Sequence, residues 1–522
     1  MSENFYITTP IYYVNAEPHI GHTYTTLIAD TLARYHALAG ESTFMLTGSD
    51  EHGEKVLEVA QQRGQTAEEV AEYYSTTFRE TWDKLGIRYD RFIRTTDPDH
   101  RAVVQGVLQA VYDAGHIEFQ EYEGLYCVGC ERFLTDRDLE DGLCPDHERA
   151  PEKRTEANYF FKMGPHFSWL SEHIRENPDF IRPERYRNEV LSMLGEESGL
   201  SGDLCISRPK SRLEWGIELP FDSGYVCYVW FDALINYLTG IGYPDSPQFE
   251  ALWARAEHCL GKDILKPHAV FWPCMLKAIG LAPPRHLNVH GFWNADERKV
   301  SKSLGNMISP LTMKEKYGFE PFRYFLLREM SFGTDSNFTE ELMVTRINAD
   351  LANNLGNLVS RTLNMVKRFT EGQVPEPGKP GELEEEVAAK AQAILPEIDA
   401  AMRSNRPHRA LEALFGLVDT TNRYLEQREP WKVAKLEGGE ESVRTTLYTC
   451  CEALRITAIL LSPFMPETAE EILRRAGQAG ALEKARLPES IAWGGARVGA
   501  ETHKGQPLFP RIDLEALAES AE

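Results

Sequence analysis

The sequence predicts an α/β fold with a parallel sheet, followed by a bundle of helices. The run Phe5 to Ile7 favours a strand that stops at Pro10, and apolar residues at helical spacing follow Pro18. A second strand is predicted over Thr43 to Thr47, and from residue 348 onward the pattern is helical with little strand character. Folds of this class bind nucleotides where a strand ends and turns into a helix, so the first such turn is a candidate site.

Length and composition indicate a soluble protein of two to four domains. The chain has 522 residues, of which 42% are hydrophobic and 26% charged. Its longest apolar run, Ile456 to Met465, is too short to span a bilayer, and the N-terminus lacks a signal segment. An odd count of nine cysteines favours a reduced, cytoplasmic compartment. The net charge of −24 argues against non-specific coating of nucleic acid but permits a local basic surface that binds one RNA.

The first turn contains two imidazoles around a glycine, His19, Gly21 and His22. A helix N-terminus presents free N–H groups and a positive dipole to an anion, and imidazoles can add hydrogen bonds to phosphate. Gly21 lets a phosphate or a flat base approach the backbone closely. On these residues alone, an ordinary helix cap with two surface histidines is an equally good interpretation.

The second strand is expected to end in a polar turn over Gly48 to Gly53, which holds Asp50 and His52. Parallel sheets bring such strand ends together at one crevice, so ligand-binding roles are predicted, with helix capping and surface exposure as the alternative. Helices are expected over Ala67 to Leu85 and Pro98 to Ala114.

Four residues have the spacing of a zinc site. Cys127 and Cys130 form a Cys-x-x-Cys pair, and Cys144 and His147 form a Cys-x-x-His pair after thirteen intervening residues. Three thiolates and one imidazole would complete tetrahedral coordination and leave no position for water, so the predicted site is structural. It would stabilise a small inserted module that has little apolar core of its own.

Two further stretches are ambiguous on their own. Trp230 to Tyr237 is predicted to be a helix, and plain core packing explains its apolar face. Lys299 and Lys302 lie among serines before Gly305, in a loop that could fold over phosphates but that resembles many surface loops.

In the C-terminal part, residues 372–386 are predicted to connect helices, because they are rich in Pro, Gly and acidic residues. Helical periodicity covers residues 387–402, 407–426 and 442–461. Residues 507–512 are expected to form a tail packed on the rest of the protein.

Taken together, these motifs resemble the class I aminoacyl-tRNA synthetases, and within them the methionyl-tRNA synthetase family, bacterial type with a single zinc knuckle. Residues 19–22 match the HIGH signature, and residues 299–303 match the KMSKS signature with Val300 in place of the usual methionine. The resemblance covers nearly the whole chain, with the motifs in the right order. It implies a Rossmann-like parallel-sheet catalytic domain, a zinc-bearing connective insertion and an all-α anticodon-binding domain. The expected boundaries are 1–115 and 226–345 for the two catalytic halves, 116–225 for the insertion and 346–522 for the bundle.

The resemblance also implies roles for individual residues. Catalysis and phosphate neutralisation are assigned to His19, His22, Lys299 and Lys302. ATP binding is assigned to His19, Gly21, His22, Gly261, Asp263 and Lys302. Methionine binding is assigned to Ile11, Tyr13, Asp50, Trp230, Leu234, Tyr237 and His268, which replaces the core interpretation of the Trp230 helix. Anticodon reading is assigned to Asn357, Arg361 and Trp431, with bundle core as the alternative for Trp431.

The same resemblance implies one structural Zn²⁺, Mg²⁺ bound with ATP, and the substrates L-methionine, ATP and tRNA(Met). His147 stands where the family more commonly has a fourth cysteine. The chain ends soon after the bundle, without the appended C-terminal RNA-binding and dimerisation domain of some members, so a monomer is expected. A cytoplasmic location with no membrane association is expected from the cysteines and the apolar runs described above. The alternatives are a cysteinyl, leucyl, isoleucyl or valyl synthetase, and a non-catalytic zinc-containing RNA-binding protein on the same fold.

Overall fold

The computed structural model describes residues 4–128, 132–134, 138–145, 148–195, 199–200, 202–295, 298–299 and 307–513. The chain divides into two compact units. Unit 1 contains Met1–Glu3, His19–Thr43 and Gly291–Glu522, and unit 2 contains Asn4–Pro18 and Phe44–His290. None of the described helices is long and apolar enough to cross a bilayer.

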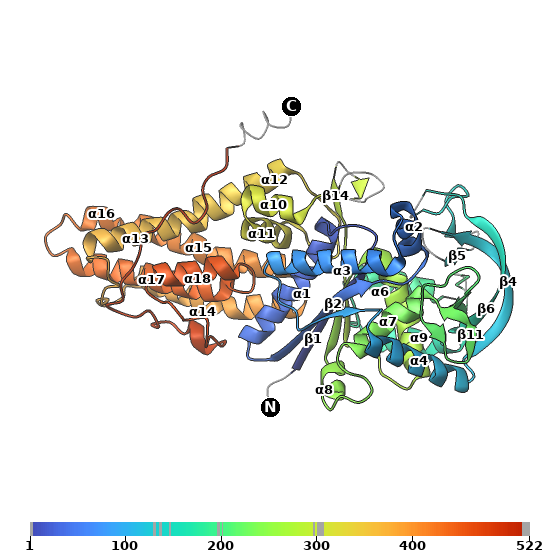
Figure 1. The fold of residues 1–522 in the computed structure, drawn as a ribbon. Coiled ribbons are helices and arrows are strands. Elements are labelled where there is room, and N and C mark those ends of the chain that lie inside the picture. The colour runs from blue at the N-terminus through green and yellow to red at the C-terminus, as the bar shows by residue number, and fades with distance from the viewer. Residues whose placement is uncertain are drawn as a thin grey trace. The chain divides into compact units, whose positions relative to one another are not determined.

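Unit 2 is built on a sheet with the strand order β3-β2-β1-β12-β13-β7 (Figure 1). The pairs β2–β3, β1–β12, β12–β13 and β13–β7 are parallel, as predicted. The strand bounds are β1 Asn4–Tyr13, β2 Ser42–Asp50, β3 Arg91–Arg94, β7 Ile181–Arg182, β12 Ala256–Gly261 and β13 His286–His290. Central β1 has its sequence neighbour β2 on one side and the distant β12 on the other. This change of direction in strand order is where open α/β sheets form ligand-binding crevices.

Helices of unit 2 pack their apolar residues on this sheet in one continuous core. α3 begins at a capping box formed by Thr66 and Glu69, and Pro98 is the first residue of α4. Both helices fall within one residue of the predicted bounds. The helices are α2 Glu54–Arg63, α3 Ala67–Lys84, α4 Pro98–Asp113, α7 Val229–Thr239, α8 Phe249–Trp253, α9 Trp272–Ala278, the 3₁₀-helix η4 Lys262–Ile264 and the π-helix η5 Pro267–Phe271.

Two predictions of strand ends were wrong. Pro10 does not stop β1, which continues to Tyr13. The residues of β1 that pair with β12 are Tyr6 to Thr8, which all precede Pro10. The missing N–H of Pro10 therefore removes no bond from that register. Likewise, Gly48 to Asp50 belong to β2 and not to a turn, and a Cβ at Gly48 would lie 2.0 Å from the Ile93 carbonyl oxygen of β3.

Apart from β7, which belongs to the main sheet, the segment between α4 and α7 forms an inserted module in unit 2. Figure 1 shows β4 and β6 as long, curved strands, and they pair antiparallel from Ile117 opposite Phe161 to Tyr126 opposite Glu152. The order of this second sheet is β5-β4-β6-β8, and β9, β10 and β11 form a smaller one. The bounds are β4 Ile117–Cys127, β5 Arg132–Leu134, β6 Glu152–Lys162, η2 Gly164–His166, α5 Phe167–Glu176, α6 Glu184–Met193, β8 Asp203–Cys205, β9 Ser207–Pro209, β10 Glu218–Leu219 and β11 Asp222–Cys227.

Unit 1 combines α1 with a small sheet, β15-β14-β16, and the predicted helix bundle, whose C-terminal helices Figure 1 shows in orange and red. α12, the π-helix η7 and α13 follow one another without a break. The bounds are α1 Ile20–Leu38, β14 Trp293–Ala295, β15 Arg298–Lys299, α10 Pro310–Tyr317, α11 Phe319–Glu329, β16 Ser336–Asn337, α12 Glu340–Arg346, η7 Ile347–Gly356, α13 Asn357–Phe369, α14 Glu382–Arg403, α15 Pro407–Arg428, α16 Pro430–Val433, α17 Glu440–Leu461, α18 Pro466–Arg475 and η8 Glu489–Ile491.

A buried ion pair joins α1 to α11. Asp30 and Arg323 are 0% and 1% exposed, and their side chains form a salt bridge. The Arg323 guanidinium also donates to the carbonyl oxygens of Phe464 (2.6 Å) and Pro463 (2.9 Å), between α17 and α18. One turn earlier in α11, Glu320 accepts from the backbone N–H groups of Glu467 and Thr468 at the start of α18. α11 therefore holds together α1 and the turn that leads into α18.

The C-terminal tail is packed on unit 1, as predicted. Phe509 is 7% exposed, and Asn348 of η7 exchanges two hydrogen bonds with the backbone of Ile512, at 2.8 and 2.9 Å. The predicted connection over residues 372–386 was too long, because α14 begins at Glu382. Acidic residues in the first turn favour an earlier helix start through the helix dipole, and Glu384 closes a capping hydrogen bond with the Gly381 backbone.

Candidate functional site

In unit 2, the sequence-predicted binding residues gather at the carboxyl ends of the parallel strands. Tyr13 ends β1, Asp50 ends β2 and Gly261 ends β12. Gly261 pairs with His290, the last residue of β13. These are the ends that border the change of strand order between β1 and β12, so the prediction of one shared crevice agrees with the observed topology.

Tyr237 of α7 is fixed by a chain of buried hydrogen bonds. Its hydroxyl lies 2.7 Å from Nε2 of His268, whose Nδ1 lies 2.9 Å from the carbonyl oxygen of Ile264. Because that carbonyl can only accept, Nδ1 carries the ring proton and the Tyr237 hydroxyl donates to Nε2. Burial lowers the pKa of His268 to about 4 despite its bond to Ile264, so the ring is neutral at pH 7.

A second buried histidine, His258, packs against Tyr237. His258 of β12 stacks on the Tyr237 ring, with centroids 4.1 Å apart. It bonds to the hydroxyl of Thr8 at 2.8 Å and accepts from the Trp272 indole at 3.2 Å. Burial lowers its pKa well below the ordinary value, so His258 is a neutral part of the core behind Tyr237.

The other predicted methionine-binding residues differ in exposure. Leu234 is 1% and Asp50 4% exposed, whereas Ile11, Tyr13 and Trp230 are half-buried. The half-buried state of Trp230 does not fit a plain core residue. All seven residues, from Ile11 to His268, belong to unit 2 and come from β1, the end of β2, α7 and η5.

In unit 1, His19 and His22 cap α1 in a reciprocal arrangement. Nδ1 of His19 accepts from the Gly21 N–H at 3.0 Å, and Nδ1 of His22 accepts from the His19 N–H at 3.4 Å. The rings stack with centroids 3.8 Å apart, and a Cβ on Gly21 would lie 2.9 Å from the His19 ring. Burial and the neighbouring His19 lower the pKa of His22 well below its usual value. An Nδ1 that accepts leaves the proton of a neutral ring on Nε2, from which it can be donated to an anion.

Ile308, which follows the predicted lysine loop in the sequence, contacts the same helix. The backbone N–H of Ile20, in the first turn of α1, donates to the Ile308 carbonyl oxygen at 3.0 Å. Before the loop, Lys299 ends β15 and pairs with Asn294 of β14. Lys302 lies outside the described residues, so its predicted role stays a prediction.

Two of the four predicted zinc ligands are described. Cys127 and Cys144 are 3% and 0% exposed and share one small cluster with Leu134. The turn after Cys144 is closed by a hydrogen bond from the Glu148 N–H to the Cys144 carbonyl oxygen at 2.7 Å. Cys130 and His147 lie outside the described residues, and within the described ones no three metal-ligating side chains gather.

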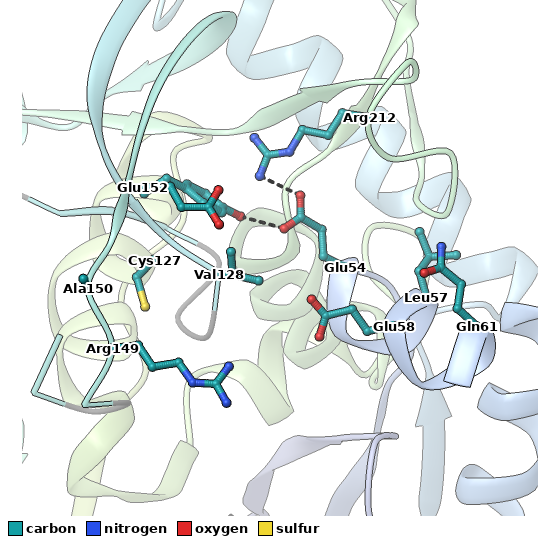
Figure 2. Close-up of a pocket in the computed structure, with 11 residues that line it drawn as sticks. Glu54, Leu57, Glu58, Gln61, Cys127, Val128, Arg149, Ala150, Glu152 and Arg212 are labelled. Atoms are coloured by element: carbon teal, nitrogen blue, oxygen red, sulfur yellow. Dashed lines mark hydrogen bonds and ion pairs between the residues drawn. The ribbon is translucent and has the colours of Figure 1, made fainter. Parts of the chain in front are cut away.

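A pocket of about 600 Å³ lies beside Cys127. Figure 2 shows Glu54 paired with Arg212 on one side of it, and Cys127 and Arg149 on the other. Glu54 is the first residue of α2, and its carboxylate lies 2.6 Å from Arg212 and 3.3 Å from the Tyr126 hydroxyl of β4. The strand that ends in Cys127 is therefore attached to the helix that follows the Asp50 strand end.

In the bundle, the three predicted anticodon residues lie on neighbouring helices. The Arg361 guanidinium lies over the Trp431 ring, 5.6 Å from its centroid. Asn357 is exposed and Trp431 half-buried, so Trp431 is not a fully buried core residue. A cavity of about 370 Å³ is lined by Asn357, by Asn353 one turn earlier and by tail residues 507–509. Asn353, which lines the same cavity, was not among the predicted residues.

Known proteins are similar to this chain along its whole length. The sequence profile for class I tRNA synthetases (M) matches residues 5–153 and 138–363, and that for the anticodon binding domain of methionyl tRNA ligase matches 374–519. The methionine–tRNA ligase of Deinococcus radiodurans is 44% identical over 519 residues, which are 98% of this chain and 75% of that protein. The methionine–tRNA ligase of Synechocystis sp. is 40% identical and aligns over 98% of both proteins.

Among solved structures, the Mycobacterium tuberculosis methionyl-tRNA synthetase in complex with methionyl-adenylate superposes with a TM-score of 0.92. It is 39% identical, over 98% of this chain and 100% of that one. These matches confirm the prediction of a methionine–tRNA ligase and favour it over the cysteinyl, leucyl, isoleucyl, valyl and non-catalytic alternatives. The chain belongs to the methionyl-tRNA synthetase family, the class I aminoacyl-tRNA synthetases that are methionine–tRNA ligases.

Proposed function

We propose that the carboxyl-end crevice of the sheet in unit 2 binds L-methionine, and that the N-terminus of α1 and the loop over residues 299–303 bind the phosphates of ATP. The carboxylate of methionine attacks the α-phosphorus, a P–O bond forms, and pyrophosphate leaves to give methionyl-adenylate. A hydroxyl of the 3′-terminal adenosine of tRNA(Met) then attacks the methionyl carbonyl, and AMP leaves. Both steps need positioning and charge neutralisation more than covalent chemistry from the protein.

The observation that carries this proposal is the buried bond between Tyr237 and His268. A hydroxyl fixed at 2.7 Å from a neutral imidazole gives the Tyr237 ring one orientation. A rigid aromatic wall suits the flexible thioether of methionine, because sulfur–ring contacts add to plain burial. Asp50, at the adjacent strand end, supplies the charge that binds the substrate ammonium. Gly261 and Asp263 stand at the end of β12, where the adenosine would bind.

On α1, the protons of His19 and His22 are the proposed donors to the ATP phosphates. Capping at both Nδ1 atoms selects the tautomer with Nε2–H. The Ile20–Ile308 hydrogen bond supports a role for the loop, because it ties the end of the lysine-bearing segment to the same helix turn. Lys302, with Lys299, would neutralise the charge that develops on the α-phosphate and the leaving pyrophosphate.

We also propose one structural Zn²⁺ held by Cys127, Cys130, Cys144 and His147. Two buried thiols in one cluster and a closed turn after Cys144 fit that donor set, and bound zinc would supply folding energy to the module. Mg²⁺ bound with ATP and a cytoplasmic monomer complete the proposal.

Replacing Cys144 with serine is expected to abolish zinc binding, because three ligands no longer fill a structural site. Metal analysis of the purified protein should find one zinc ion per chain in the parent and less than about a tenth of that in the variant. Thermal unfolding should begin at a lower temperature as the module loses its support. Cys205→Ser is the control, since Cys205 lies outside the motif. Full zinc content in Cys144→Ser would contradict the assignment.

Replacing Trp431 with alanine is expected to impair charging of tRNA(Met) without changing methionine-dependent ATP–pyrophosphate exchange. Stacking of an unpaired base on an aromatic ring contributes about 1–3 kcal/mol, so kcat/KM for tRNA should fall about 5- to 150-fold. The matched control is Leu436→Ala, because Leu436 is 65% exposed and follows α16 closely. Normal charging by Trp431→Ala would restore a structural role for this indole.

Methionine-dependent ATP–pyrophosphate exchange is the direct test of the proposed site. Exchange should require methionine, ATP and Mg²⁺, and leucine or cysteine should not replace methionine. When two substrates differ by one methylene, a pocket with apolar walls binds them with free energies that differ by only about 1–3 kcal/mol. Norleucine and homocysteine are therefore expected to support slow exchange. Exchange with leucine or cysteine at the methionine rate would contradict the assigned pocket.

A further inference from the structure

One carboxylate in unit 2 is buried between two imidazoles. Asp232 is 0% exposed, and its Oδ2 lies 2.6 Å from Nδ1 of His52 while its Oδ1 lies 2.8 Å from Nε2 of His100. Burial alone would raise the pKa of Asp232, but the two histidines outweigh it and lower the pKa to about 2. An ionised carboxylate accepts only, so both histidines donate to it.

His100 contacts α7 at a second point. Its Nδ1 lies 3.2 Å from the Thr239 hydroxyl, in the last residue of α7. Thr239 follows Asp232 by seven positions, which places both on one face of the helix at about 100° per residue. By the same geometry, the proposed pocket residues of α7 occupy the opposite face: Trp230, Leu234 and Tyr237. His100 of α4 therefore holds the face of α7 that points away from the pocket.

His52 connects this helix to the proposed ammonium site. It follows Asp50 by two residues, and its hydrogen bond to Asp232 joins the end of β2 to α7. The backbone between them is held as well, because the Trp215 indole donates to the Glu51 carbonyl oxygen at 2.5 Å. His52 is 1% exposed, and its Nε2 has no hydrogen-bond partner within the described part of the structure.

A small rotation of α7 would displace the side chains of the proposed methionine pocket. Side chains reach about 5 Å from a helix axis, so a rotation of α7 by about 20° would move pocket atoms by roughly 2 Å. Misplacement of about 1 Å can change a rate by about 100-fold. Two anchors on the back of α7 oppose that rotation.

We propose that His52, Asp232 and His100 are positioning residues for methionine, which fix the rotation of α7 and its distance from Asp50. They do not contact the substrate. This inference rests on the methionine pocket proposed above.

His100→Leu and His52→Leu are expected to raise the KM for methionine about 10-fold or more in pyrophosphate exchange, while the KM for ATP stays within about threefold. Each has a conservative partner that keeps the donor atom facing Asp232. Gln places an amide nitrogen where Nε2 of His100 lies, and Asn does so for Nδ1 of His52. His100→Gln and His52→Asn should therefore keep the KM for methionine within about threefold of the parent.

A structural role alone would predict a different result. Leu170→Ala opens a cavity in α5, which packs on α6 and α9, and provides a variant with lowered thermal stability for comparison. The inference is overturned if the leucine variants lower the melting temperature as Leu170→Ala does and leave the KM for methionine unchanged. It is also overturned if His100→Gln and His52→Asn fail to restore the KM.

The proposed pocket has its own readout. Asp50→Asn raises the KM for methionine if the pocket is correctly assigned, whatever the three positioning residues do. An unchanged KM for methionine in Asp50→Asn refutes the proposed pocket. If Asp50→Asn raises the KM for methionine but both leucine variants keep the parental value, only the positioning role is refuted.

Discussion

Replacing Lys302 with alanine is expected to slow methionyl-adenylate formation by about 100- to 1000-fold. The reason is the role proposed for its ammonium, which would neutralise charge that appears on the phosphates only as the P–O bonds form and break. Such an interaction changes kcat and leaves ground-state binding of methionine within about threefold. Single-turnover formation of adenylate, measured by rapid quench, gives the rate, and equilibrium dialysis gives the methionine affinity.

The control for this variant is Lys314→Ala in α10, a lysine outside the 299–303 loop. It should form adenylate at close to the parent rate. Equal losses of rate and of methionine affinity in Lys302→Ala would contradict a transition-state role and indicate a general disturbance of the loop.

Replacing Asp50 with asparagine is expected to weaken methionine binding by about 2–4 kcal/mol, or about 30- to 1000-fold, because the substrate ammonium then enters a buried site without its counter-charge. Asp50 is 4% exposed, so water screens little of this interaction. The KM for methionine in pyrophosphate exchange measures the effect.

An analogue of methionine that lacks the amino group separates charge from shape. It should inhibit the parent and Asp50→Asn with nearly equal constants, because neither complex contains the ion pair. If the analogue loses as much affinity as methionine does, Asp50 supports the pocket through its packing, and the assigned ammonium contact is wrong.

The sequence predicted the parallel sheet and the main helices, because each has a local signal, and it supplied the site residues as assignments from motifs. Helical spacing marks α1, α3 and α4, and motif order marks residues 19–22 and 299–303. Assigning Trp230 to the methionine pocket required the family resemblance, because an apolar helix face has the same sequence pattern whether it lines a core or a pocket. Pro10 was misread because its effect depends on which residues of β1 pair with β12, and register is not a local property.

Side-chain pairings between distant parts of the chain could not be predicted, because they too are not local properties of the sequence. His52 and Asp232 lie 180 residues apart, and nothing near either residue in the sequence indicates the other. The sequence does not indicate the buried ion pair of Asp30 and Arg323 either, because charged residues on helices are usually solvent-exposed. Cys130, His147 and Lys302 lie outside the described residues, so those assignments rest on spacing and motif alone.

The pairing of α1 with α11 limits how this enzyme can be recombined with its relatives. Asp30 and Arg323 share a buried bond, Tyr35 donates to Asp399 of α14 at 2.8 Å, and the Leu38 carbonyl accepts from Leu487 at 3.0 Å. The helix with the ATP signature thus contacts α11 and, through Tyr35 and Leu38, the segment that matches the anticodon binding domain. A chimera that exchanges the bundle at the apparent boundary near residue 346 would inherit mismatched partners for α1. A workable graft must transfer residues 19–43 together with everything after residue 290.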